Sequence, residues 1–269
     1  MRSDETLQIL HVTDSHLHAD PDNELYGVQT DRSFRAVVER ALSATRWRPA
    51  AVLATGDLVE DHSRQGYERF REIMAPCGLP VLCLPGNHDD PALMSQILDN
   101  DLFSFCATHD IGCWRLIMLN SHVTGAEGGE LSEPELERLE AGLTGSKGRH
   151  VLVNVHHQPI DMGSTWLDGY GLRNGPELLS MLSRHAQVKG VLWGHVHQAS
   201  DRQYQNLRML STPSTCAQFT PGTETCVMDI RPPGFRRLNL KADGGIDSEV
   251  VWLDDWVMNE RPPDSRVGE

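Results

Sequence analysis

The chain has 269 residues, of which 39% are hydrophobic, and its formal net charge is −14 at neutral pH. This length is sufficient for one large domain with a sizeable core, and the acidic balance argues against a nucleic-acid-binding surface, which would be basic. The six cysteines form no C-x-x-C pair, so we expect them to be reduced, with Cys83 in the core.

No stretch of the sequence has the character of a signal peptide or a membrane span. The first apolar run, 7–12, is too short for either, and no later run is long enough. We therefore expect a cytoplasmic protein that binds neither membrane nor nucleic acid. The negative charge still permits a small phosphate-bearing substrate if bound metal supplies local positive charge. The oligomeric state is unknown from the sequence.

The first third of the chain repeats one order of elements: a short buried strand, a polar turn and an amphipathic helix. Strands are predicted at 8–13, 51–54 and 80–84, because these runs are short, apolar and bounded by turn residues. A helix follows the first strand, with Thr30 or Asp31 as its N-cap. A second helix contains Tyr67, Phe70 and Met74 at helical spacing. The third helix is predicted to begin at Pro91.

The second half continues the α/β pattern and then changes to antiparallel strands. Strands are predicted at 114–120, 151–155 and 190–193, with helices over 132–143 and 176–184 and a long polar loop at 160–175. Ser132 and Glu135 have the spacing of a capping box. Further strands are predicted at 208–210, 235–241 and 249–253. The domain is expected to span 1–258, followed by a disordered polar tail at 259–269.

Potential metal ligands follow five of the predicted strands. Ligands of open α/β sheets bind beyond the carboxyl ends of the strands, so these side chains are expected to converge. Carboxylates, an amide oxygen and imidazoles suit a pair of divalent transition metals, and the absence of cysteine disfavours a structural zinc site. The five groups are Asp14 with His16, Asp57, Asn87 with His88, His156 with His157, and His195 with His197.

This arrangement resembles the calcineurin-like metallophosphoesterase family, whose pattern is D-x-H, G-D, G-N-H-D/E, a single His and G-H-x-H. The corresponding blocks here are Asp14-Ser15-His16, Gly56-Asp57, Gly86-Asn87-His88-Asp89, His156 and Gly194-His195-Val196-His197. The resemblance extends over 7–253 and implies a four-layer α/β/β/α sandwich of two mixed sheets. One departure is that Gln158 separates the double histidine from Pro159, where many members have proline directly.

The resemblance also implies a role for each ligand position. One ion would be held by Asp14, His16 and His197, the other by Asn87, His156 and His195, with Asp57 bridging the two. The ions would be iron or manganese, with zinc or cobalt tolerated. His88 would contact the substrate phosphate without binding metal. Catalytic roles are expected for Asp57, Asn87 and His88, and substrate contacts for His16, Asp57, Asn87, His88 and His197.

Three stretches outside the metal motif look like those of the bacterial 3′,5′-cyclic AMP phosphodiesterases (class III): 171–174, 212–219 and 233–236. The implied reaction is attack on phosphorus by metal-bound hydroxide, with His88 protonating the 3′ oxygen, to give AMP. We expect the segments 160–175 and 212–219 to hold the base and the sugar. Alternatives are a broad-specificity or glycerophospho-phosphodiesterase of the same family and a metal-free protein-binding scaffold. All seven ligands are present, which argues against the scaffold.

Other polar residues near these blocks are interpreted more conservatively. His11 lies within a strand and is expected in the core or in a polar network. His18 and His62 are expected to be solvated, although either could line the pocket. Glu60, Asp61 and Asp89 are expected to support the metal ligands or to be solvated. For Trp166 the alternatives are packing within its loop and contact with the substrate; for Arg173 they are a surface charge and contact with the substrate. Structural or exposed positions are expected for His109, His122, His150 and His185.

Overall fold

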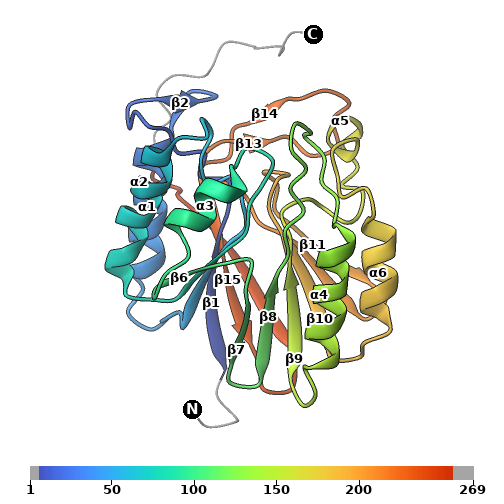
Figure 1. The fold of residues 1–269 in the computed structure, drawn as a ribbon. Helices are drawn as coiled ribbons and strands as arrows, with labels where there is room; N and C mark the ends of the chain where they lie inside the picture. The colour runs from blue at the N-terminus through green and yellow to red at the C-terminus, as the bar shows by residue number, and fades with distance from the viewer. Residues whose placement is uncertain (1–5, 257–269) are drawn as a thin grey trace.

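The structure, a computed structural model, describes residues 6–256. Two six-stranded sheets lie face to face, with helices α1 and α2 covering the outer face of one sheet and α4 and α6 that of the other (Figure 1). This is the expected four-layer α/β/β/α sandwich of two mixed sheets. The predicted tail at 259–269 lies outside the described residues, and the domain bounds 1–258 stay a prediction.

The first sheet has the strand order β16-β15-β1-β4-β5-β6. Strands β1, β4, β5 and β6 are parallel to one another. At one edge, β15 pairs antiparallel with β1, and β16 pairs antiparallel with β15. The strands are β1 Leu7–Val12, β4 Ala51–Ala54, β5 Val81–Cys83, β6 Phe103–Phe105, β15 Gly234–Leu240 and β16 Ile246–Trp252. The accompanying helices are α1 Thr30–Leu42, α2 Arg64–Met74, η1 Ala75–Cys77 and α3 Pro91–Ile97.

The second sheet has the order β11-β12-β10-β9-β8-β7, with a parallel centre and an antiparallel strand at each edge. Its strands are β7 Thr108–Ile111, β8 Trp114–Met118, β9 His150–Asn154, β10 Val188–Trp193, β11 Ser200–Tyr204 and β12 Leu207–Ser211. Its helices are α4 Glu133–Thr144, α5 Thr165–Asp168 and α6 Gly175–Ser183. Two short pairs lie apart from the sheets: β2 Glu24–Leu25 with β3 Val28–Gln29, and β13 Gln218–Phe219 with β14 Met228–Asp229.

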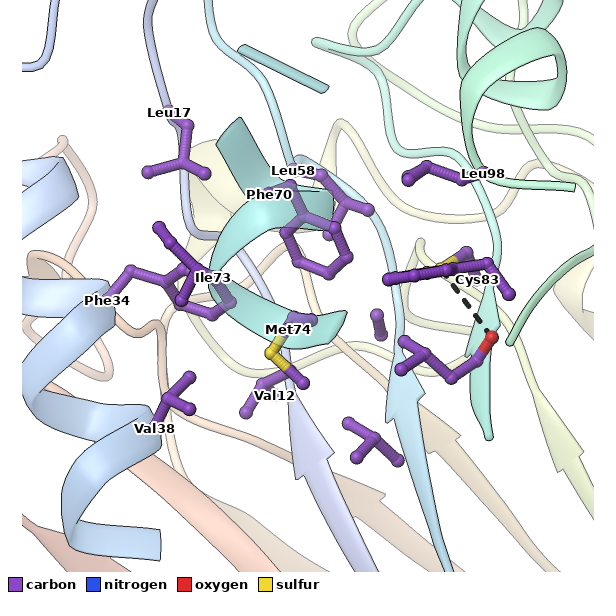
Figure 2. Packing of buried hydrophobic residues seen from close by; sticks show 14 of the residues in the cluster. Val12, Leu17, Phe34, Val38, Leu58, Phe70, Ile73, Met74, Cys83 and Leu98 are labelled. Atoms are coloured by element: carbon purple, nitrogen blue, oxygen red, sulfur yellow. Dashed lines mark hydrogen bonds between the residues drawn. The ribbon is translucent and has the colours of Figure 1, made fainter. Parts of the chain in front are cut away.

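Apolar side chains fill all three spaces between the four layers. In β1, Leu10 and Val12 pack under the helices, whereas Ile9 faces the second sheet, as the alternation of a strand requires. Figure 2 shows Phe70 and Met74 of α2 against this first sheet, beside residues of α1. Burial on both faces explains why the central strands are mostly apolar. The packing also places each strand end at a fixed point beside its neighbour.

Two predicted helix starts differ in detail from the structure. The N-cap of α1 is Gln29 rather than Thr30 or Asp31, because Gln29 still has extended backbone (φ −68°, ψ 106°) and the helix begins at Thr30 itself. Ser132 caps α4 as expected. The carboxylate of Glu135, however, accepts from the backbone amide of Asn120 at 2.6 Å instead of closing the capping box.

The cysteines are free thiols in the structure, and Cys83 is buried in β5 as expected. Among residues 6–256, no helix combines the length and the apolar character needed to span a membrane.

Candidate functional site

The ligand side chains predicted from the sequence lie together at the carboxyl ends of five parallel strands. The first sheet contributes the residues after β1, β4 and β5, and the second sheet those after β9 and β10. Asn87 and His88 are partly exposed, whereas the other side chains are almost completely buried. The buried members are Asp14, His16, Asp57, His156, His195 and His197.

The backbone at this site is held in an unusual conformation. Five of the donor residues have positive φ angles, a region that costs a non-glycine residue on the order of 1–3 kcal/mol each. A Cβ on Gly86 would overlap the carboxylate of Asp57, and one on Gly194 would overlap Thr13. The glycines that precede Asn87 and His195 therefore allow the loops to approach closely. The five residues are Asp14, His16, Asp57, His195 and His197, with φ between 45° and 63°.

The donors Asp14, His16 and His197 form one half of the cluster. Nε2 of His16 lies 3.1 Å from Nε2 of His197, which lies 3.5 Å from Oδ1 of Asp14. The Nδ1 atoms of the two rings face other acceptors, Glu60 Oε2 at 2.7 Å and the Ala217 carbonyl at 2.8 Å. With their protons on Nδ1, both rings direct Nε2 lone pairs at one another, and a cation would relieve this repulsion.

The second half of the cluster contains Asn87, His156 and His195. Nε2 of His156 lies 3.2 Å from Oδ1 of Asn87, while its Nδ1 is 2.7 Å from the Thr55 carbonyl. Nε2 of His195 is buried and has no hydrogen-bond partner among the described residues. Burial and the neighbouring charge of His156 lower the pKa of His195 to about 3, so its ring is neutral with a free lone pair. This half of the cluster also fits a cation.

Asp57 lies between the two halves. Its Oδ2 is 3.2 Å from Nε2 of His156 and 3.9 Å from Nε2 of His16, while Oδ1 accepts from the backbone amide of His88 at 2.9 Å. Burial alone would raise the pKa of Asp57, but the imidazoles of His156 and His88 hold it well below its usual range. A charged carboxylate in this position can share two cations.

His88 stands at the open side of the cluster and contacts Glu60. Nδ1 of His88 lies 3.1 Å from Oε2 of Glu60, the same oxygen that faces His16. Burial alone would lower the pKa of His88, but Asp57 and Glu60 raise it to about 10, so the ring carries a proton at neutral pH. Glu60 thus orients two site histidines, which agrees with the supporting role expected for it.

Three buried groups lie beside the donors without being free to bind metal. Both ring nitrogens of His157 are occupied, Nδ1 by the Ser121 hydroxyl at 2.8 Å and Nε2 by the Glu127 carbonyl at 3.1 Å. Burial raises the pKa of the Cys216 thiol to about 12, so it remains protonated. The carboxylate of Asp89 accepts from backbone amides of the surrounding turns and from the Tyr67 hydroxyl. These contacts hold the turns in place.

The segment 212–219, expected to hold the nucleoside, is buried at every residue. The hydroxyl of Ser214 donates to the Asp14 carbonyl at 2.7 Å, and the ring of Phe219 stacks on His197 with centroids 4.6 Å apart. His11 is buried as expected, with its ring nitrogens 2.5 and 2.7 Å from the hydroxyls of Thr212 and Thr55. The segment therefore packs directly against the donor residues, and its contact with the nucleoside stays a prediction.

An open cleft of about 530 Å³ adjoins the donors on the side of Asn87 and His88. Its other wall includes His122 and Glu127, which no sequence motif marks as functional, and His62, which is predicted from the sequence to be solvated or to line the pocket. Neither Trp166 nor Arg173 lines it. Trp166 packs edge-on against Phe219, and Arg173 pairs with Glu130 at the surface. No motif marks the wall that contains His122 and Glu127, because this segment is a surface loop between β8 and α4.

Comparisons with known proteins agree with this architecture. Residues 7–199 match the calcineurin-like phosphoesterase family. The chain is 38% identical to the 3′,5′-cyclic adenosine monophosphate phosphodiesterase CpdA of Pseudomonas aeruginosa, over 95% of this chain and 93% of that protein. It is 40% identical to CpdA of Escherichia coli, over 93% and 90% of the respective lengths.

Solved structures show the same fold. A dimetal phosphatase from Danio rerio superimposes with a TM-score of 0.65 at 15% identity, covering 93% of this chain and 99% of that one. GAP50 of Plasmodium gives a TM-score of 0.60 at 11% identity, over 95% and 87% of the two chains. Fold, motif blocks and sequence identity together show that the chain belongs to the calcineurin-like phosphoesterase family.

Proposed function

We propose that the protein is a metal-dependent phosphodiesterase that hydrolyses 3′,5′-cyclic AMP to 5′-AMP. The observation that carries the proposal is its identity of 38% and 40% to two proteins named for this activity, over at least nine tenths of each chain. The buried cluster of carboxylate and imidazole donors supports it, since such donors suit divalent transition metals.

Two ions per chain, iron or manganese, are proposed to occupy the cluster. Asp14, His16 and His197 would hold one ion, Asn87, His156 and His195 the other, and Asp57 would contact both. Bound ions would supply positive charge for the phosphoryl oxygens and lower the pKa of water toward neutrality. The short distances from Asp57 to His156 and His16 support its shared position.

The side chains at the open edge have roles that follow from their contacts. His88 lies beside the donors with Nδ1 facing the Glu60 carboxylate, which favours a protonated ring, so it can give a proton to the departing 3′ oxygen. Glu60 keeps the His88 ring oriented through the contact at 3.1 Å. In a cyclic diester the leaving 3′ oxygen stays attached to the ribose of the AMP product. The proton is therefore needed where that oxygen lies in the site.

A substrate panel tests the proposal against the alternatives of a broad-specificity or glycerophospho-phosphodiesterase. The purified protein would be reconstituted separately with iron, manganese, zinc and cobalt, and kcat/KM measured for cyclic AMP, cyclic GMP, glycerophosphodiesters and bis(p-nitrophenyl) phosphate. We expect the highest kcat/KM with cyclic AMP. Equal rates on all diesters would favour the broad-specificity enzyme, and absence of bound metal and of turnover would favour the scaffold. The cytoplasmic location and the absence of nucleic-acid or membrane partners stay predictions.

A further inference from the structure

The cleft beside Asn87 and His88 is bounded by a surface loop, residues 120–130, that is firmly tied to the body of the protein. The amide of Glu130 donates to the Ser121 carbonyl at 3.0 Å, which joins the two ends of the loop. At its tip, the amide of Ala126 donates to the Val123 carbonyl at 3.1 Å, and Gly125 has φ +75°. This is a type II turn, which requires a positive φ at its third residue. These hydrogen bonds stabilise the shape of the loop within the protein itself.

His157 connects this loop to the metal-donor cluster. It follows the donor His156 directly, and its ring spans the loop from the Ser121 hydroxyl to the Glu127 carbonyl. Gly129 packs so closely on the ring that a Cβ there would overlap it. The position of Glu127 is thus fixed relative to the donors.

The side chain of Glu127 contacts the site through Asn87. Oε2 of Glu127 accepts from Nδ2 of Asn87 at 3.0 Å, which leaves Oδ1 of Asn87 facing His156. Among the described residues, no other group donates to this carboxylate, and Glu127 lines the cleft. Its second oxygen is therefore an available hydrogen-bond acceptor at the point where the cleft meets the donors.

We propose that the cleft is the nucleoside subsite and that Glu127 determines specificity by accepting a hydrogen bond from the 2′-hydroxyl of the substrate. This inference rests on the proposed function and adds to it. The 2′-hydroxyl is attached next to the carbon that bears the 3′ oxygen, so it lies close to the phosphate. The exocyclic amine of adenine lies at the far end of the base. The carboxylate of Glu127, which is hydrogen-bonded to Asn87, is therefore closer to the expected position of the 2′-hydroxyl than to that of the adenine amine.

The expected consequence is discrimination between ribose and deoxyribose. A site built to pair with a hydroxyl rejects the analogue that lacks it, because its own polar group is left unpaired. We expect kcat/KM of the unmodified protein to be about 10- to 100-fold higher for 3′,5′-cyclic AMP than for its 2′-deoxy analogue, the scale of a hydrogen bond to a charged group. The affinities for AMP and 2′-deoxy-AMP should differ in the same direction.

Glu127→Gln separates the contact with Asn87 from the contact with the hydroxyl. The glutamine carbonyl can still accept from Asn87, but an amide nitrogen, a donor, then replaces the free oxygen. We expect the ratio of kcat/KM for the two nucleotides to fall at least fivefold, with a smaller change on bis(p-nitrophenyl) phosphate, which has no hydroxyl. Glu130→Ala is the matched control, because Glu130 belongs to the same loop but pairs with Arg173 at the surface; its ratio should equal that of the unmodified protein.

The outcomes distinguish failure of the subsite from failure of the proposed function. If the unmodified protein hydrolyses both nucleotides equally, or if Glu127→Gln keeps the full preference, the role of Glu127 is wrong while the phosphodiesterase activity stands. The hydroxyl contact would also be overturned if Glu127→Gln lost only the preference for 3′,5′-cyclic AMP over 3′,5′-cyclic IMP and kept the preference for ribose over deoxyribose. Hydrolysis of bis(p-nitrophenyl) phosphate without any turnover of cyclic AMP would overturn both.

Discussion

The metal-donor cluster and the loop 120–130 lie side by side but are built differently. The donors stand at strand ends, almost fully buried, on backbone with positive φ angles. The loop is exposed at its tip and at Glu127 and Glu130, and it reaches the donors through His157 and Glu127. In this family member, the groups that would contact the phosphate belong to the fold itself. The groups that would contact the nucleoside belong to the loop 120–130, whose sequence can change without altering the two sheets.

The largest effect should come from removing the shared carboxylate at the centre of the donor cluster. Asp57→Ala should lower kcat/KM on every diester by at least about 1000-fold, since it removes a group that acts directly on the reacting centre. It should also weaken binding of both ions. Metal content by elemental analysis and turnover measured together provide the test. Asp101→Ala, an exposed carboxylate far from the motif blocks, is the control. Near-normal metal content and turnover in Asp57→Ala would overturn its assignment.

A smaller effect is expected from His88, at the boundary between the two regions. His88→Ala should keep both ions and lower kcat on cyclic AMP by about two to four orders of magnitude, the usual scale for a general acid. The loss should shrink on an aryl diester, whose leaving group needs little protonation. His109→Ala on the edge strand β7 is the control. An equal loss on both substrates would argue that His88 positions the phosphate instead.

The donor cluster could be predicted from the sequence because its determinants are local. Each block is a buried strand followed within a few residues by a donor, and parallel strands bring such ends together. Asp14 and His197 illustrate this: they lie 183 positions apart in the numbering, yet their ligand atoms are 3.5 Å apart. The four-layer fold could be predicted because these blocks resemble those of the calcineurin-like phosphoesterase family.

The cleft wall and the edge strands could not be predicted in the same way. Glu127 acts through Asn87 and His157, which are distant in sequence, so no spacing marks it. Strand β11 is exposed along most of its length, and β7 is only half-buried, so neither has the apolar run of a central strand. The segment 212–219 resembles a substrate-binding stretch in sequence, and the structure adds what the sequence does not show, that it is buried and hydrogen-bonded to Asp14 and His197.

A moderate effect should follow from loosening the link between the two regions. His157→Phe keeps the ring volume but removes the hydrogen bonds to Ser121 and Glu127, each worth about 1 kcal/mol. We expect unchanged metal content, a free energy of unfolding lower by about 1–3 kcal/mol, and kcat/KM on cyclic AMP lower by about tenfold. Bis(p-nitrophenyl) phosphate should be affected less. Loss of a bound ion in His157→Phe would show instead that His157 supports the cluster rather than the loop.

The smallest effect is expected at Arg173, for which the sequence left open a contact with substrate. Its guanidinium lies 3.5 Å from Glu130, and the two side chains are 55% and 50% exposed, so their attraction is weakened by water. Arg173→Ala should therefore change kcat/KM on cyclic AMP by less than about twofold and the free energy of unfolding by less than about 0.5 kcal/mol. The backbone amide of Arg173, which donates to the Gly129 carbonyl at 2.9 Å, is kept in the variant, so the loop 120–130 should hold its position. Steady-state kinetics and urea denaturation provide the measurements, with Arg184→Ala as the control, because Arg184 forms a similarly exposed ion pair with Glu140. A fivefold or greater rise in KM confined to Arg173→Ala would return this residue to the substrate site. The nucleoside contacts would then have to extend beyond the cleft to the loop 160–175, and the division between a fixed donor cluster and a single variable loop would no longer hold.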